Sequence, residues 1–131
     1  MKYIFDSSAI FRAIKENRVD ILVGNGTLEL ARYELGNVLW KTHSQQGKVT
    51  LKDLKDLMRL VRKALNVMEV LSMGDREEEI LDTATTLKVT FYDASYVFCA
   101  KSLELTLITE DARLLKKVPP QMKASRLDAV V

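Results

Sequence analysis

The feature that most constrains this chain is a short apolar run near its start that ends abruptly at an acid. Tyr3-Ile4-Phe5 leads into Asp6 and two serines, after which apolar residues return at helical spacing. The run does not alternate with polar residues, which is typical of a strand covered on both faces of a parallel sheet. Asp6 would then lie at the carboxyl end of the strand, and ligands bind at that edge of open parallel sheets.

Strand-like and helix-like segments alternate along the chain. Helices are expected over 9–14, 31–46, 51–65, 75–87, 92–100 and 114–117, and further strands over 27–30, 67–71, 103–109 and 122–127. This alternation predicts a single α/β domain over residues 1–131, built as a three-layer α/β/α sandwich around a parallel sheet of four to five strands. Apolar stripes also predict that Leu51 and Leu81 are buried on their helices.

Composition excludes several classes of protein. A helix needs about 20 apolar residues to span a bilayer, and no apolar run in the sequence approaches that length. The first residues do not have the pattern of a signal peptide. The single cysteine, Cys99, excludes an internal disulfide and a cysteine-based zinc site. We therefore expect a cytoplasmic protein without a membrane partner. The net charge of +2 neither demands nor excludes nucleic acid.

Four acids that are far apart in sequence are expected at one edge of the sheet. Asp6 and Asp111 each follow a core strand, Asp93 lies in the first turn of a helix, and Glu34 lies one turn into another helix. Right-handed crossovers bring the ends of parallel strands and the starts of the following helices to the same edge. The topology therefore predicts a pocket that contains all four carboxylates.

Four carboxylates in one pocket repel each other, and a divalent cation relieves that repulsion. Oxygen ligands suit a hard ion such as Mg²⁺, with Mn²⁺ as a substitute, better than they suit zinc. Magnesium keeps several waters in such sites and can meet a phosphate. The acids therefore favour phosphodiester hydrolysis by a metal-activated water, without a covalent intermediate, because no Ser–His or Cys–His pair is available.

The motifs that carry these acids resemble those of the PIN-domain family, and more narrowly its VapC-type toxins of toxin–antitoxin pairs. The matching stretches are Phe5-Asp6-Ser7-Ser8, Tyr33-Glu34-Leu35-Gly36-Asn37, Tyr92-Asp93-Ala94-Ser95-Tyr96 and Leu107-Ile108-Thr109-Glu110-Asp111-Ala112-Arg113-Leu114. The resemblance covers the whole chain. It implies a Mg²⁺-dependent endoribonuclease that acts on RNA, forms a homodimer and is blocked by a small antitoxin protein.

The resemblance also assigns roles to individual residues. It implies that Asp6, Glu34, Asp93 and Asp111 are both the catalytic and the metal-binding residues, with no other cofactor. Small or hydroxyl residues beside the first acid correspond to Ser7 and Ser8, and a Thr-x-Asp motif corresponds to Thr109 and Asp111. Glu110 stands at the variable place of that motif, where it would either support the metal or face solvent.

Each of these residues also has a purely structural interpretation. Asp6, Asp93 and Asp111 could simply cap helices, and Glu34 could form a salt bridge with Arg32 or Lys41. Ser7, Ser8 and Thr109 could be caps or could orient the acids. Tyr96 is expected to serve packing or a partner groove. A basic helix face is either solvated or a path for RNA; it consists of Lys52, Lys55, Arg59, Arg62 and Lys63.

Three other functions compete with the nuclease. A catalytically silent PIN-like module would bind RNA or a partner protein without cutting, although all four acids are present. A phospho-receiver domain has similar length and alternation but requires an acid pair after the first strand, where this chain has Asp6 followed by serines. A P-loop enzyme is excluded because no GxxxxGK[ST] sequence occurs.

Overall fold

The computed structural model describes residues 1–47 and 49–130 and contains a parallel sheet of five short strands. The strand order is β3-β2-β1-β4-β5, so the first strand is central and the last lies at an edge. The strands are β1 (Tyr3–Phe5), β2 (Gly26–Leu28), β3 (Glu69–Leu71), β4 (Thr106–Ile108) and β5 (Ala124–Ser125). Every pairing is parallel, which confirms the predicted α/β sheet.

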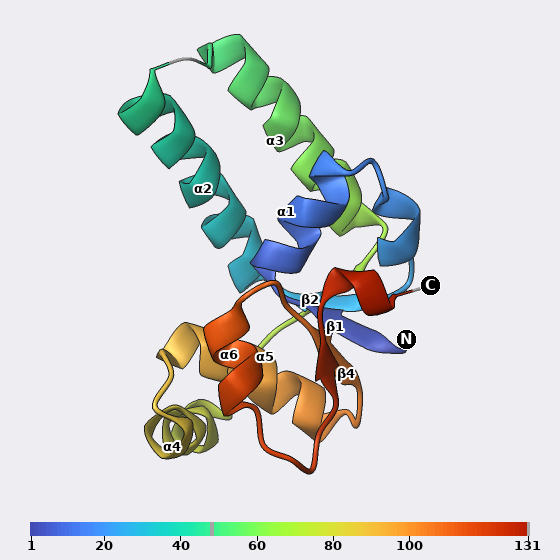
Figure 1. Ribbon diagram of the computed structural model, residues 1–131, viewed down its shortest axis with the longest axis vertical. Coiled ribbons are helices and arrows are strands. Elements are labelled where there is room, and N and C mark those ends of the chain that lie inside the picture. Colours follow the sequence, from blue (N-terminus) through green and yellow to red (C-terminus); the bar gives the residue numbers. More distant parts are fainter. Residues whose placement is uncertain (48, 131) are drawn as a thin grey trace.

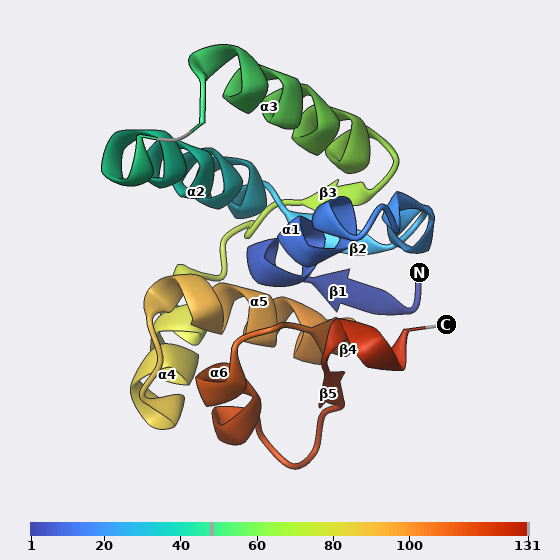
Figure 2. The same ribbon diagram turned by 45° about the horizontal axis from the view of Figure 1, so that its top comes forward.

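Helices cover both faces of the sheet and confirm the predicted three layers. The helices are α1 (Ser7–Lys15), α2 (Leu30–Gln46), α3 (Leu51–Asn66), α4 (Glu77–Leu87), α5 (Phe91–Ser102) and α6 (Ala112–Lys117), with 3₁₀ turns η1 (Val19–Leu22) and η2 (Leu127–Ala129). Helices α1 to α3 lie on one side of the sheet and α4 to α6 on the other (Figure 2). Helices α2 and α3 run side by side and project from the sheet as an arm (Figure 1).

Neighbouring residues of the central strands point to opposite layers. Phe5 and Ile108 belong to the core formed with α1, α2 and α3, whereas Ile4 and Leu107 belong to the core formed with α5 and α6. All four side chains are fully buried, because both faces of the sheet are covered. Because both faces of β1 are buried, the strand is continuously apolar in the sequence. Asp6 follows directly after this buried strand.

The structure corrects three details of the sequence prediction. Strand β2 ends at Leu28, because Leu30 already begins α2. Leu51 and Leu81, both expected to be buried, are 56% and 54% exposed. Leu51 opens α3 at the outer end of the arm, while α4 packs on α5 through Ile80 and Ala84 and leaves Leu81 on the outside. None of the helices in residues 1–47 and 49–130 has the length and apolar character needed to cross a membrane.

Candidate active site

Asp6 lies where β1 ends and α1 begins, and its carboxylate caps that helix. Its peptide N–H donates to the carbonyl oxygen of Ile108 at 3.0 Å, which ties the turn to β4. Its Oδ1 accepts hydrogen bonds from the Ser8 hydroxyl at 2.6 Å and from the Ala9 N–H at 3.0 Å. The side chain is only 5% exposed. Both hydrogen bonds end on Oδ1, so capping occupies one carboxylate oxygen and leaves Oδ2 for another role.

A chain of hydrogen bonds joins Asp6 to the turn after β4. Besides donating to Asp6, the Ser8 hydroxyl accepts the Glu110 N–H at 3.0 Å and lies 3.4 Å from the Thr109 hydroxyl oxygen. The Thr109 oxygen in turn accepts the Asp111 N–H at 3.1 Å. Thr109 also hydrogen-bonds the Asp6 carboxylate. Ser8 and the buried Thr109 therefore fix the turns that carry Asp6 and Asp111 relative to each other.

Asp111 repeats the arrangement of Asp6 at the start of α6. Its Oδ1 accepts the N–H groups of Arg113 at 2.9 Å and Leu114 at 3.3 Å, which caps the helix. As with Asp6, these hydrogen bonds end on one carboxylate oxygen. Capping and ligand binding are thus compatible at both positions.

Glu34 reaches the same region from α2 and is held by a tyrosine of α5. The hydroxyl of Tyr96 donates to its Oε1 at 2.8 Å. Arg32, one of the cations that could have neutralised Glu34, instead pairs with Glu29 at 2.8 Å. Burial raises the pKa of Glu34, and the hydrogen bonds from Tyr96 and Ser7 offset part of that rise. The structural alternative for Glu34, a salt bridge with Arg32, is therefore not formed.

Asp93 lies one turn before Tyr96 on α5 and is the electrostatic centre of the group. Burial raises its pKa, and the charge of Asp111 raises it further. Asp93 in turn raises the pKa values of Asp6 and Glu34, for which burial is the largest cause. The pKa of Asp6 reaches about 6. Four acids from four elements of the fold are therefore close enough to interact electrostatically, with Asp93 coupled to each of the others.

The described residues fit a hard divalent cation in chemistry, although they do not form a closed cage. Within residues 1–47 and 49–130, no three Asp, Glu, His or Cys side chains stand together as a ready metal-ligand set. Mg²⁺ usually takes one or two carboxylates and fills its other positions with water. Acids with raised pKa values and free carboxylate oxygens suit such a partly hydrated ion, because its charge offsets their repulsion.

The side chain of Glu110 has a different position from the four acids. Its carboxylate accepts hydrogen bonds from Arg12 at 2.6 Å, Arg126 at 3.2 Å and the Leu127 N–H at 2.8 Å. Burial opposes its ionisation, but these three donors outweigh burial and lower its pKa. Glu110 therefore meets the site through its backbone N–H, while its side chain joins α1 to the segment after β5. Sequence reasoning did not single out Arg12, whose partners Glu110 and Asp128 lie 98 and 116 residues away.

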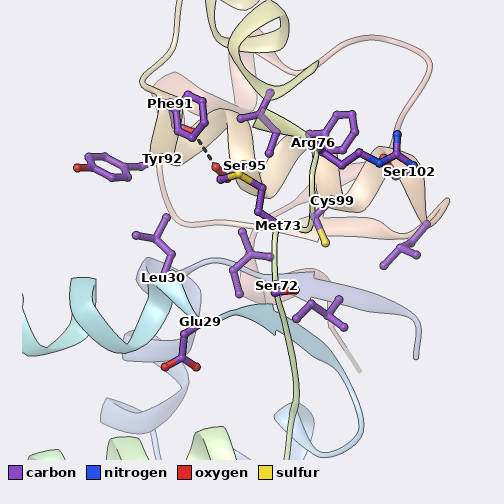
Figure 3. A pocket seen from close by; sticks show the side chains of 15 residues that line it. Glu29, Leu30, Ser72, Met73, Arg76, Phe91, Tyr92, Ser95, Cys99 and Ser102 are labelled. Carbon is purple, nitrogen blue, oxygen red and sulfur yellow. Dashed lines mark hydrogen bonds between the residues drawn. The ribbon is translucent and has the colours of Figure 1, made fainter. Parts of the chain in front are cut away.

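An apolar cavity of about 550 Å³ lies on the opposite face of α5 from the acids. Phe91, Ser95 and Cys99 of α5 and Met73 from the segment before α4 form part of its wall (Figure 3). Asp93 and Tyr96 occupy the other side of the helix, because residues three and four apart share a face. The cavity therefore does not belong to the acidic site.

Comparison with known sequences agrees with the resemblance of the motifs. Residues 3–119 match the family model described as PIN domain. The chain is 34% identical over 119 residues to a protein named Exonuclease VapC9 from Pyrobaculum aerophilum, covering 89% of this chain and 86% of that protein. It is 31% identical over 93 residues to Ribonuclease VapC3 of the same organism, covering 71% of this chain and 70% of that protein.

Comparison with solved structures gives the same result for the fold. The crystal structure of PAE2754 from Pyrobaculum aerophilum matches with a TM-score of 0.81 and 32% identity, covering 98% of this chain and 92% of that chain. VapBC2 from Rickettsia felis, solved bound to a DNA fragment from their promoter, matches with a TM-score of 0.68 at 16% identity, covering 96% and 98%. The second match, at such low identity, bears on the fold alone.

Proposed function

This chain belongs to the PIN-domain family, and from that premise we propose that it is a Mg²⁺-dependent endoribonuclease, the toxin of a VapC-type toxin–antitoxin pair. One observation carries the proposal: Asp6, Glu34 and Asp111 each use one carboxylate oxygen to hold the protein together. The hydrogen bonds that cap α1 and α6 and the one from Tyr96 each end on a single oxygen, while Thr109 also approaches Asp6 and Ser7 approaches Glu34. Asp93 couples electrostatically to all three.

In the proposed mechanism, Asp6 and Asp93 hold the metal most directly, and Glu34 and Asp111 complete the pocket through water or at a second metal position. A bound divalent cation supplies charge neutralisation of the phosphodiester and a lower pKa for an attacking water. Ser8 and Thr109 keep Asp6 and Asp111 in fixed orientations. Within the described residues the hydroxyl groups at the site have no histidine to activate them, because His43 hydrogen-bonds the Val49 carbonyl near the end of α2. Cys99 lies on the far face of α5.

The direct test is cleavage of single-stranded RNA by the purified, partner-free protein. We expect cleavage with Mg²⁺ or Mn²⁺ and none with EDTA. Asp6→Asn should abolish cleavage, whereas Asp82→Asn, an equal substitution at an exposed position of α4, should leave it unchanged. Full activity of the Asp6→Asn protein would refute the assignment.

Whether the protein cuts RNA internally or from an end needs a separate test, because one relative is named an exonuclease and the other a ribonuclease. An endonuclease linearises a circular single-stranded RNA, whereas an exonuclease cannot begin on it. We expect the circular RNA to be cut. If linear RNA were degraded while the circular RNA stayed intact, the protein would still be a nuclease, but an exonuclease instead of an endonuclease.

The principal alternative is a catalytically silent module that binds RNA or a partner. Its support is that no three metal-binding side chains are already grouped within the described residues. Calorimetric titration with Mn²⁺ separates the two functions. Metal uptake that Asp6→Asn abolishes supports the nuclease, whereas RNA that is bound but left intact, without metal uptake, supports the silent module.

We propose three partners in addition to the metal: a small antitoxin, a second copy of the chain, and RNA along the basic face of α3. The apolar cavity between α5 and the segments that follow β2 and β3, with exposed Leu103 at its edge, offers a surface for dimer formation. Four basic residues line a cavity of about 310 Å³ between α2 and α3: Arg32, Lys55, Arg59 and Arg62. A cytoplasmic location remains part of the same proposal.

Each partner has its own measurement. Light scattering after gel filtration should give twice the mass of the chain. We expect a small neighbouring reading frame to encode the antitoxin, and co-expression of the two proteins should yield a complex that no longer cuts RNA. Lys55→Ala should weaken RNA binding and reduce its salt dependence, while metal uptake is unchanged. A monomeric mass would contradict the homodimer. Failure to form a complex would contradict the antitoxin, and an unchanged salt dependence would contradict RNA binding along α3.

A further inference from the structure

Tyr96 is an aromatic side chain that reaches the acidic site from inside the core. It is 1% exposed and packs with Ile4, Val97 and Leu107 beneath the sheet. Its hydroxyl nevertheless ends at Oε1 of Glu34, at 2.8 Å. Because Tyr96 follows Asp93 by one helical turn, α5 carries one acid of the site and holds another that belongs to α2.

The Glu34 side chain needs a hydrogen bond from outside its own helix to fix its carboxylate at the site. It lies on α2, one of the two helices of the projecting arm (Figure 1). A glutamate side chain has three rotatable bonds, and fixing it costs up to about 2 kcal/mol of conformational entropy. Arg32 on the same helix is already paired with Glu29. Ser7 approaches the carboxylate from α1, and Tyr96 is the donor that fixes its Oε1 from the buried core.

We propose that Tyr96 is a positioning residue, whose hydroxyl holds Oε1 of Glu34 and thereby presents the other carboxylate oxygen to the metal. This inference rests on the proposed function, because it treats Glu34 as a metal-binding residue. Tyr96 itself does not touch the metal or the RNA. Its contribution is to remove the freedom of Glu34 before the metal arrives, as supporting residues around metal ligands do.

A simpler account reverses cause and effect. A buried phenol needs a hydrogen-bond acceptor, and Glu34 could be present only to satisfy Tyr96. In that case a phenylalanine at position 96, which fills the same space and needs no acceptor, would leave the behaviour of Glu34 toward metal unchanged. The two accounts therefore differ in the result of one substitution.

The first measurement is calorimetric titration of Tyr96→Phe with Mn²⁺ in the absence of RNA. We expect Mn²⁺ affinity to fall about ten-fold or more, as it does on loss of partners that orient metal ligands. Tyr92→Phe is the matched control, since Tyr92 lies on the same helix but is 59% exposed. In a Glu34→Ala background the Tyr96→Phe substitution should have no further effect, because the two residues act as one unit. Unchanged affinity, or an equal loss without Glu34, would overturn the proposal.

The second measurement needs no metal. In EDTA, the carboxyl ¹³C resonance of Glu34 should change its chemical shift in Tyr96→Phe, because the carboxylate loses its hydrogen bond from the phenol. The same resonance should keep its chemical shift in Tyr92→Phe. An unmoved resonance would show that Tyr96 does not position Glu34. If the wild type takes up no Mn²⁺, the proposed function fails at the metal, and this resonance still decides the role of Tyr96.

Discussion

Replacing Asp6 by asparagine should make the metal-free protein more stable while abolishing its activity. Burial raises the pKa of Asp6 from 3.8 to about 6, so the ionised form is disfavoured in the folded protein. Asparagine keeps the shape and can still accept the hydrogen bonds of Ser8 and Ala9 through its side-chain oxygen. It is also as good a helix cap as aspartate. The substitution therefore removes a buried charge without removing its local structure.

The magnitude follows from the two pKa values. Each pH unit between them corresponds to about 1.4 kcal/mol, so ionisation of Asp6 costs the fold about 3 kcal/mol. Because the folded pKa is the higher one, the stabilising effect of neutral Asp6 is fully present below pH 3.8 and is lost as pH rises to about 6. Weaker hydrogen bonds of a neutral acceptor offset part of the gain. We expect Asp6→Asn to be about 1–3 kcal/mol more stable than wild type at pH 8 and equal to it near pH 4.

The assay is urea unfolding of both proteins in EDTA at pH 4 and pH 8. Addition of Mg²⁺ at 100 times its Kd should stabilise the wild type by about 2.7 kcal/mol and the variant by much less, so the gap closes or reverses. Asp82→Asn on α4 serves as the exposed control. A variant that is less stable than wild type at pH 8, or a difference that does not change with pH, would refute the reasoning.

Three further substitutions test other contacts. Glu110→Gln should destabilise the protein by about 1–3 kcal/mol at pH 7: burial opposes ionisation of Glu110, but a backbone N–H and two guanidinium groups outweigh it and lower its pKa below 4.5. That contribution is present above pH 4.5 and lost as pH falls through the folded pKa, so urea unfolding should show the two proteins converging in acid. Gly26→Ala would place a methyl group 2.6 Å from Cδ1 of buried Ile4, and thermal unfolding should show a loss of about 1–3 kcal/mol; an unchanged Tm would mean that the sheet yields easily. Ser8→Ala removes the 2.6 Å hydrogen bond to Asp6 and should weaken Mn²⁺ binding by about ten-fold, measured by calorimetry against Ser44→Ala on the exposed end of α2.

The sequence predicted the layers of the fold because the relevant signals are local. A continuous apolar run such as Tyr3-Ile4-Phe5 requires cover on both faces, and alternation with helical stripes then requires a parallel sheet. The predicted burial of Leu51 and Leu81 was wrong. A stripe of apolar residues identifies one face of a helix, but it does not show how much of that face the neighbouring elements cover. Leu51 lies at the outer end of the arm, and Leu81 lies on the side of α4 that faces away from α5.

The same distinction applies to the site. Topology alone placed Asp6, Glu34, Asp93 and Asp111 at one edge, since parallel strands have a common carboxyl end. The support from Tyr96 spans 62 residues and the ion pair of Arg12 with Glu110 spans 98. A hydrogen bond across such a separation leaves no periodic pattern in one sequence.

The pairing of the first strand with the fourth also sets the order of events during synthesis. The Asp6 N–H finds its acceptor only when Ile108 exists, and the Glu110 carboxylate requires the Leu127 N–H. At about 5–20 residues per second, roughly 5–20 s separate the synthesis of these two ends. Under the proposed function, the site therefore stays incomplete until Asp111 has been made, so most of the chain is synthesised before its four acids can come together.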